Sequence, residues 1–179
     1  MAEVQIRPAI ATDLNTLMAF DHSCQSDYVW QMDIQSENGQ VGAVFREIRL
    51  PRTVTVAYPR SVSMLSETWN RRSGMLVAVI DEQVVAYTRM NDAIVQHTAW
   101  ITDLVVSPRY RRQEIAILLM QSVQTWAVQR KNLRVLLEMS SKNNPAIRLA
   151  QKLGFEFCGY NDAYYEQQDI ALFFGRFIR

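Results

Sequence analysis

Residues Ile101–Met120 read I-T-D-L-V-V-S-P-R-Y-R-R-Q-E-I-A-I-L-L-M, and this stretch decides the fold. The apolar run 104–106 has the composition of a β-strand. Pro108 ends it, because proline lacks the backbone N–H that a central strand uses. A basic turn, 109–112, follows, and after it apolar residues recur at steps of three and four to about Arg130. This spacing predicts a strand, a cationic turn and a long amphipathic helix.

A strand, a cationic turn and a helix in this order can hold an anion. The backbone N–H groups in the first turn of a helix have no intrahelical partner, and the helix macrodipole adds partial positive charge there. Arg109, Arg111 and Arg112 at that point suit a phosphate or a pyrophosphate. From composition alone, a surface turn with solvated arginines is an equally good interpretation.

The order of the residues favours the pyrophosphate. The run V-x-P-x-Y-R-R-Q-x-I-A-x-x-L resembles the pyrophosphate loop of the GNAT superfamily of N-acetyltransferases, which bind acetyl-CoA. The resemblance implies that the loop pattern R/Q-x-x-G-x-G/A falls on Arg111, Arg112, Gln113, Glu114, Ile115 and Ala116. The alanine fits this pattern, whereas the family usually has glycine where this chain has glutamate. The resemblance continues to Phe155, and more loosely to the C-terminus.

The composition indicates one ordinary globular domain, residues 1–179, with 49% hydrophobic and 21% charged residues. A formal net charge of +1 gives no overall basic bias toward nucleic acid. We find neither the apolar core of a signal peptide nor a run of roughly 20 apolar residues that would span a bilayer. Cys24 and Cys158 form no metal-ligand spacing with His22 or His97, so we expect buried free thiols, a reducing cytoplasm and no metal. The oligomeric state stays open, with a homodimer as one alternative.

The pattern of apolar residues predicts a mixed α+β sheet. We expect strands at 4–7, 28–35, 41–50, 53–58, 74–80, 84–90, 97–106, 134–139, 156–160 and 170–178. We expect helices at about 11–24, 64–72, 115–130 and 144–153, the last with Asn144 as its N-cap and Gly154 as its stop. The strands 28–35 and 41–50 form a hairpin inserted around residues 28–50. The GNAT resemblance implies a twisted, mostly antiparallel sheet whose two middle strands splay apart and admit the pantetheine arm.

The resemblance also assigns the cofactor contacts. Backbone groups of Leu104, Val105 and Val106 would pair with the pantetheine amides, and residues 111–116 would hold the pyrophosphate. Asn143 opens the run N-x-x-A-I-x-L-x-x-K-L-G-F and would help to hold the cofactor, although helix-capping chemistry explains this residue nearly as well.

Glu114 has a predictable effect on the pyrophosphate loop. If this residue is already helical, it needs no positive φ, and an acidic side chain is favourable in a first helical turn. Its carboxylate would nevertheless repel a diphosphate ~5 Å away by roughly 1–3 kcal/mol. We therefore expect weaker cofactor binding than glycine would give at this position.

The catalytic groups are less clearly marked. The resemblance implies a tyrosine on the helix that begins near Asn143, acting as the acid that protonates the departing thiolate, but the matching residue here is Ala150. Tyr160, Tyr164 or Tyr165 could supply the acid from the following strand and loop, although each is also a good packing residue. Asp103, just before the pantetheine-pairing residues, is the candidate base, acting directly or through water. An ion pair or a turn-supporting carboxylate is an equally good interpretation.

Within the superfamily, the second half of the chain most resembles streptothricin-type antibiotic acetyltransferases, in W-A-V-Q-R (126–130), L-E-M-S-S-K-N-N-P-A and A-L-F-F-G-R-F. The implied activity is acetyl transfer from acetyl-CoA to a primary amine of a small molecule. Two alternatives remain. The chain could acetylate a protein or peptide amine, or it could be a module of the same fold that binds CoA without catalysis. Aromatic and acidic residues would suit a cationic acceptor: Tyr28, Trp30, Trp69, Tyr87, Asp27, Asp33 and Glu67.

Overall fold

The computed structural model describes residues 3–69 and 73–178. A seven-stranded sheet has the order β1-β4-β5-β6-β7-β9-β8, and a separate two-stranded sheet pairs β2 with β3. The strands are β1 (Gln5–Pro8), β2 (Cys24–Glu37), β3 (Gln40–Val56), β4 (Ser73–Ile80), β5 (Gln83–Asn91), β6 (Thr98–Val106), β7 (Arg134–Ser140), β8 (Glu156–Asn161) and β9 (Ala171–Phe177). The helices are α1 (Asp13–Met18), α2 (Met64–Thr68), α3 (Ile115–Gln129) and α4 (Asn144–Lys152), with a 3-10 turn at Pro108–Tyr110. This is the predicted mixed, mostly antiparallel α+β architecture.

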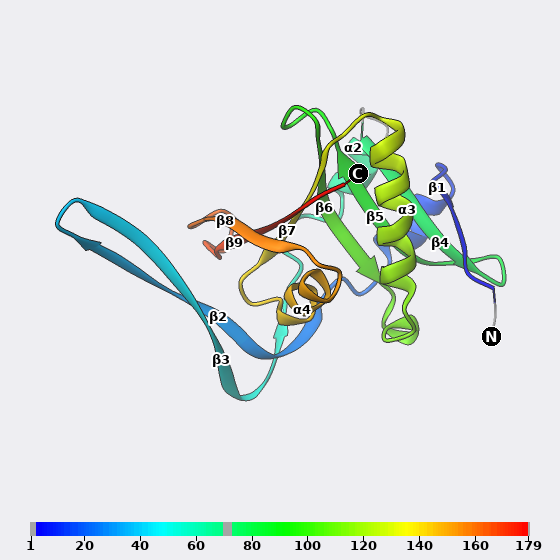
Figure 1. The fold of residues 1–179 in the computed structure, drawn as a ribbon. Coiled ribbons are helices and arrows are strands. Elements are labelled where there is room, and N and C mark those ends of the chain that lie inside the picture. The colour runs from blue at the N-terminus through cyan, green and yellow to red at the C-terminus, as the bar shows by residue number, and fades with distance from the viewer. Residues whose placement is uncertain (1–2, 70–72, 179) are drawn as a thin grey trace.

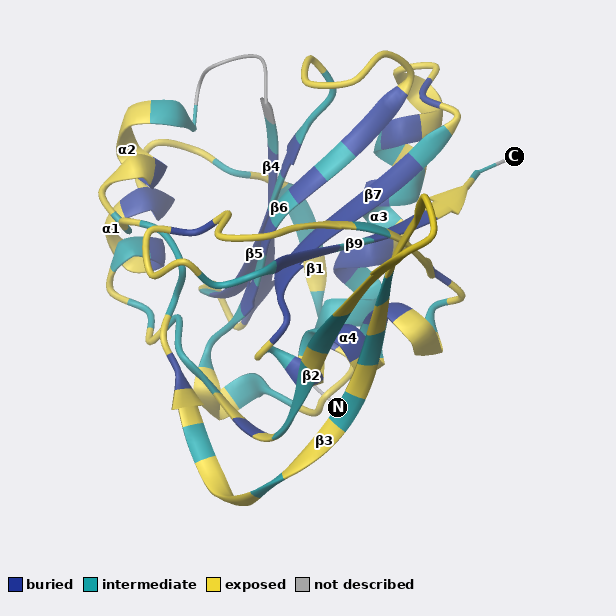
Figure 2. Ribbon diagram, turned by 90° about the vertical axis from the view of Figure 1, so that its left-hand side faces the viewer, coloured by how far each residue is buried: buried dark blue, intermediate teal, exposed yellow. Residues whose placement is uncertain are grey.

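Helices cover both faces of the large sheet (Figure 1). On one face α3 buries Leu119 and Val123 against the strands. On the other face α1 and α2 contribute Leu17 and Leu65 to a second cluster that contains Tyr87. Figure 2 shows the buried residues concentrated in the central strands, between these helix layers. The side-chain alternation of β6 therefore decides which layer each of its residues faces.

The two middle strands of the sheet part after a short paired stretch. Parallel β6 and β7 are paired from Thr98↔Arg134 to Ile101↔Leu137. Beyond that point the described register pairs join β6 to β5 and β7 to β9. The edges of β6 from Thr102 and of β7 from Glu138 therefore face each other without a shared ladder. This is the splaying that the GNAT resemblance implies.

The hairpin is longer than predicted. It runs from Cys24 to Val56 and projects away from the large sheet (Figure 1). The predicted separate segment 53–58 is mostly part of β3, so Pro51 lies inside a strand. The ladder shifts register there, since Ser26 pairs with Val54 and Tyr28 with Arg49. Proline is tolerated because it lies within this irregularity of a two-stranded ribbon.

Three further boundaries differ from prediction. Helix α1 ends at Met18 rather than near residue 24, and β2 begins at Cys24. Helix α2 covers the start of the predicted segment 64–72, whose residues 70–72 lie outside the described part of the chain. The N-cap of α4 is Asn143 rather than Asn144, since its side chain accepts the N–H of Ala146 at 3.2 Å.

The thiols also differ from prediction. Cys158 is exposed because it lies on β8, the outermost strand of the sheet, and Cys24 is half-buried. Over residues 3–69 and 73–178, no helix has both the length and the apolar character that a membrane span requires.

Candidate active site

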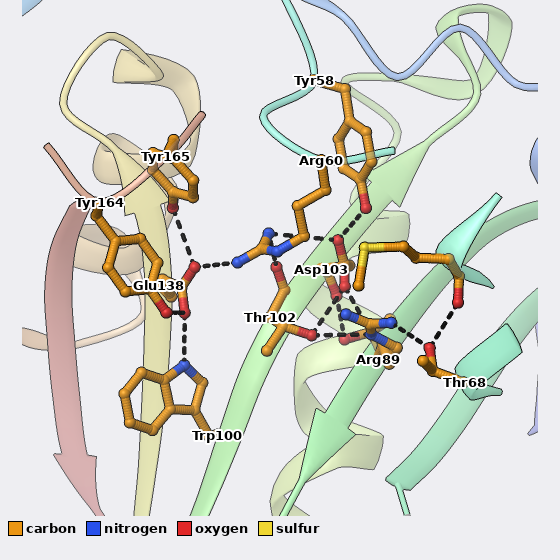
Figure 3. A network of polar contacts seen from close by, with 12 residues as sticks. Tyr58, Arg60, Thr68, Arg89, Trp100, Thr102, Asp103, Glu138, Tyr164 and Tyr165 are labelled. Carbon is orange, nitrogen blue, oxygen red and sulfur yellow. Dashed lines mark hydrogen bonds and ion pairs between the residues drawn. The ribbon is translucent and has the colours of Figure 1, made fainter. Parts of the chain in front are cut away.

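A buried carboxylate on β6 forms the first half of the site (Figure 3). The Asp103 side chain is 0% exposed, because the alternation of β6 directs it to the face covered by α1 and α2. Its Oδ1 accepts a hydrogen bond from Tyr58 Oη. Its Oδ2 lies 2.9 Å from Arg89 Nε and accepts from Thr102 Oγ1 at 2.8 Å. Both oxygens of this carboxylate are therefore in contact with donors or cations.

A second buried carboxylate lies across the opening, on β7. The Glu138 side chain is 1% exposed. Its Oε2 accepts from Trp100 Nε1 at 2.9 Å and from Tyr164 Oη at 3.2 Å. Its Oε1 accepts from Tyr165 Oη at 3.2 Å. Burial, and then the nearby Glu138 carboxylate, raise the pKa of both tyrosines, so they remain protonated donors.

Arg60 joins the two carboxylates. Its Nη2 donates to Glu138 Oε1, and its Nη1 donates to Thr102 O at 3.0 Å and lies 3.6 Å from Asp103 Oδ1. Figure 3 shows the guanidinium between β6 and β7. Burial lowers the pKa of Arg60, but the two carboxylates outweigh burial and the net shift is upward. The strands therefore part around a cation that bonds to both.

Two tyrosines and a histidine lie beside Asp103. Burial, followed by the Asp103 carboxylate, raises the pKa of Tyr58 and of Tyr87. The His22 ring centroid is 4.8 Å from that of Tyr58 and 5.9 Å from that of Tyr87. Tyr58 and Tyr87 interact through their hydroxyl groups, whereas within the described residues the buried His22 Nε2 has no hydrogen-bond partner. An unpaired buried polar atom costs free energy, so the unpartnered nitrogen of His22 needs an explanation.

Arg111 braces the turn before α3. Its Nε donates to Val106 O at 2.9 Å, and its Nη2 donates to Asp21 O at 3.0 Å and to Ser23 O at 2.8 Å. The guanidinium thus ties the end of β6 to the loop that carries His22. These bonds do not test its predicted role as a pyrophosphate ligand.

The start of α3 needs two residues with left-handed backbone. Arg112 has φ 64°, and Glu114, the N-cap of α3, has φ 63° and ψ 4°. Glu114 is not helical, so the condition under which it would need no positive φ is not met; the chain turns sharply here from β6 into α3. Gln113 Nε2 donates to Arg109 O at 3.1 Å and closes the turn. The side chains of Arg112 and Glu114 are exposed. The first N–H groups of α3 have no partner within the helix, so they are available to donate hydrogen bonds to an anion.

The remaining predicted residues have these positions. Leu104 and Val106 pack toward α3, and Val105 packs toward α1 and α2. Ile115 is buried and Ala116 half-buried in the first turn of α3. Asn143 caps α4 and also accepts from Cys24 Sγ at 3.4 Å.

The tyrosine candidates separate in space. Tyr164 and Tyr165 bond to Glu138, whereas the ring of Tyr160 packs against Phe45 of the hairpin at 5.3 Å between centroids. In the described part of the chain, no contact joins Tyr160 to Asp103 or Glu138. Its catalytic role stays a prediction without support from these contacts. Ala150 is fully buried, so α4 uses that position for packing.

The predicted acceptor wall is only partly assembled. Tyr87 interacts with Asp103, but Trp30 packs edge-on against Phe174, and Asp33 pairs with Arg46 on the hairpin. Sequence reasoning missed Glu138, Arg60 and His22. A glutamate inside the apolar run R-V-L-L-E-M-S could have indicated Glu138. Arg60 and His22 lie in loops, where no periodicity marks them.

Comparison with known proteins extends these observations. A family model described as the acetyltransferase (GNAT) family matches residues 43–155. Streptothricin acetyltransferase of Streptomyces lavendulae is 26% identical over 172 residues, which span 90% of this chain and 86% of that protein.

Two solved structures share the fold. The crystal structure of a nourseothricin acetyltransferase superposes with a TM-score of 0.83 at 22% identity, covering 98% of this chain and 99% of that one. A structure from Bacillus anthracis str. Ames, whose description suggests a streptothricin acetyltransferase in complex with acetyl coenzyme A, gives a TM-score of 0.77 at 18% identity, covering 98% and 100%. At these identities the two likenesses support the fold.

Proposed function

The chain belongs to the acetyltransferase (GNAT) family, and on this premise we propose that it transfers the acetyl group of acetyl-CoA to a primary amine of a small molecule. The observation that carries the proposal is the parting of β6 and β7 beyond Ile101↔Leu137. A narrow acyl-bearing arm needs such an interruption, because a continuous ladder would leave no backbone groups for it.

The residues around the opening fit acetyl-CoA. Leu104, Val105 and Val106 lie on the edge of β6 that has left β7, so their backbone groups can pair with the amides of the arm. The turn 107–114 directs the chain from that edge into α3, whose first N–H groups suit a diphosphate. The exposed Arg112 adds positive charge there.

The opening is lined by two carboxylates that already have cationic partners. Asp103 and Glu138 lie buried, one on each side of the opening; Arg60 bridges them, and Arg89 pairs with Asp103. Two carboxylates and two guanidinium groups leave no net charge for an ammonium group, so the first choice of acceptor comes from the relatives. The name of the Streptomyces relative makes streptothricin the first acceptor to test.

Asp103 has two proposed roles. As a base it would need a free lone pair, yet its oxygens face donors or cations from Tyr58, Thr102, Arg89 and Arg60. These contacts favour the ion-pair interpretation, in which Asp103 positions the side chains around it. Location in the cytoplasm and the oligomeric state stay predictions from the sequence.

An acceptor screen tests the proposal. The purified protein is mixed with acetyl-CoA and streptothricin, polyamines, aminoglycosides or peptides with free amines, and CoA thiol release is followed together with the mass of the acceptor. We expect a gain of one acetyl group on a cationic small amine. Transfer only to peptides would make the protein-amine alternative correct. Acetyl-CoA binding without transfer to any amine would identify a binding module instead.

A further inference from the structure

His22 is held in one tautomer by the loop that follows α1. Its Nδ1 lies 2.8 Å from Phe20 O. A carbonyl oxygen can only accept a hydrogen bond, so Nδ1 carries the proton and Nε2 of the neutral ring carries the lone pair. Among residues 3–69 and 73–178, this buried Nε2 finds no hydrogen-bond partner.

The position of the ring is fixed against the opening. It packs against Tyr58 and Tyr87, and Tyr87 is the register partner of Val105 on β6. Arg111 bonds the loop on both sides of His22 and also bonds Val106 O. The imidazole therefore lies beside the segment of β6 that we propose for the acyl-bearing arm, on the face of the two carboxylates.

Other groups near the opening are less suited to accept a proton. The oxygens of Asp103 face Tyr58, Thr102, Arg89 and Arg60. Both Glu138 oxygens also accept bonds (Figure 3). The raised pKa of Tyr58 keeps its proton bound at neutral pH. The unpartnered nitrogen of His22 remains the better acceptor.

We propose that His22 is the general base of the acetyl transfer and takes a proton from the acceptor ammonium at Nε2. This inference rests on the proposed function. The neutral amine then attacks the thioester carbonyl carbon, a C–N bond forms, and the C–S bond breaks with its electron pair on sulfur. The second nitrogen proton goes to the CoA thiolate, and imidazolium releases the first proton to solvent. The products are the amide, CoA thiol and one proton.

The direction of the pH dependence follows from the surroundings of the ring. Burial lowers the pKa of His22; the Phe20 carbonyl, Asp103 and Asp21 oppose this, and Arg111 adds to it. Tyr58 and Tyr87, the other titratable groups against the ring, stay protonated and neutral. His22 is therefore neutral above its usual pKa of about 6.5, and kcat/KM should fall as the pH drops below that value.

The test uses both histidines of the chain. His22→Asn keeps an amide N–H near the Nδ1 position for Phe20 O but removes Nε2. We expect kcat to fall about 10²- to 10⁴-fold, the acidic limb of the pH profile to disappear, and acetyl-CoA affinity to stay unchanged. His97→Asn is the matched control, because His97 is exposed and its φ of 55° is one that asparagine tolerates. Its rate and profile should match the wild type.

A normal rate or a retained acidic limb in His22→Asn overturns the inference. So does a profile in which Asp103→Asn alone removes that limb, because Asp103 would then be the base. If His22→Asn does not fold, His97→Asn still decides, since His22 is its single remaining histidine. The NMR titration midpoint of that imidazole must match the kinetic pKa, and a mismatch overturns the inference.

Failure of the inference about His22 can be distinguished from failure of the proposed function. Wild-type transfer with an unchanged His22→Asn rate overturns the base and leaves the proposed function intact. Wild-type protein that binds acetyl-CoA but transfers to no amine overturns the proposed function, and the role of His22 with it.

Discussion

Glu114 shows how one residue can work against a backbone conformation. The turn into α3 requires φ 63° here, a conformation that costs a non-glycine residue about 1–2 kcal/mol. Glycine adopts it without that cost, which gives a physical reason for the glycine in the loop pattern. The charge effect of this glutamate on acetyl-CoA binding stays a prediction from the sequence, and the sign of φ could not be read from the sequence.

Glu114→Gly should therefore raise both the stability of the protein and its affinity for acetyl-CoA. We expect a rise in unfolding free energy of about 1 kcal/mol in urea denaturation, from the relieved backbone. We also expect acetyl-CoA to bind about tenfold more tightly in calorimetry, because a nearby negative charge is removed. Glu114→Gln is the control, since it removes the charge and keeps the strained φ. Equal affinity of wild type and both variants would refute the repulsion.

At the scale of elements, the turn before α3 and the loop after α1 form one unit. Arg111 bonds to Val106 O of β6 and to Asp21 O and Ser23 O of the loop. Its neighbour Arg112 is exposed at the mouth of α3. The sequence placed both arginines in one motif, but only the fold separates a bracing role from an exposed one. Arg111 lies 90 residues from Asp21 and 88 residues from Ser23 in the chain.

Substitutions of Arg111 and Arg112 should have different effects on stability, kcat and acetyl-CoA binding. Arg111→Ala frees three carbonyl oxygens, so we expect a loss of about 1–3 kcal/mol in stability and a lower kcat, because the loop that carries His22 is released. Arg112→Ala should leave stability nearly unchanged and weaken acetyl-CoA binding about tenfold, because it removes an exposed cation beside the diphosphate. If Arg111→Ala loses as much affinity as Arg112→Ala with no loss of stability, Arg111 is a pyrophosphate ligand as the sequence predicts.

For the whole molecule, Arg60 connects the two halves of the sheet where their shared ladder ends. It bonds to Thr102 O and Asp103 on one side and to Glu138 on the other. These groups come from a loop and from two strands that are distant in sequence. Removing one partner of a buried ion pair leaves the other charges uncompensated, which is strongly destabilising.

Arg60→Met should lower the free energy of unfolding by about 3–5 kcal/mol, measured by urea denaturation. Arg46→Met is the matched control. Arg46 also forms an ion pair, with Asp33, but the two side chains are 61% and 44% exposed on the hairpin. Its loss should change stability by no more than about 0.5 kcal/mol. Similar effects of the two substitutions would mean that Arg60 does not hold the opening together.

By itself the sequence determined the order and type of most elements and the turn before α3. Those features depend on local periodicity, on proline and glycine positions, and on a motif within one stretch of chain. Only the tertiary structure decided that Pro51 lies within a strand, that Glu114 has positive φ, and that Arg60 and His22 meet the carboxylates of the opening. These outcomes depend on contacts between segments far apart in the chain, and no local pattern encodes such contacts.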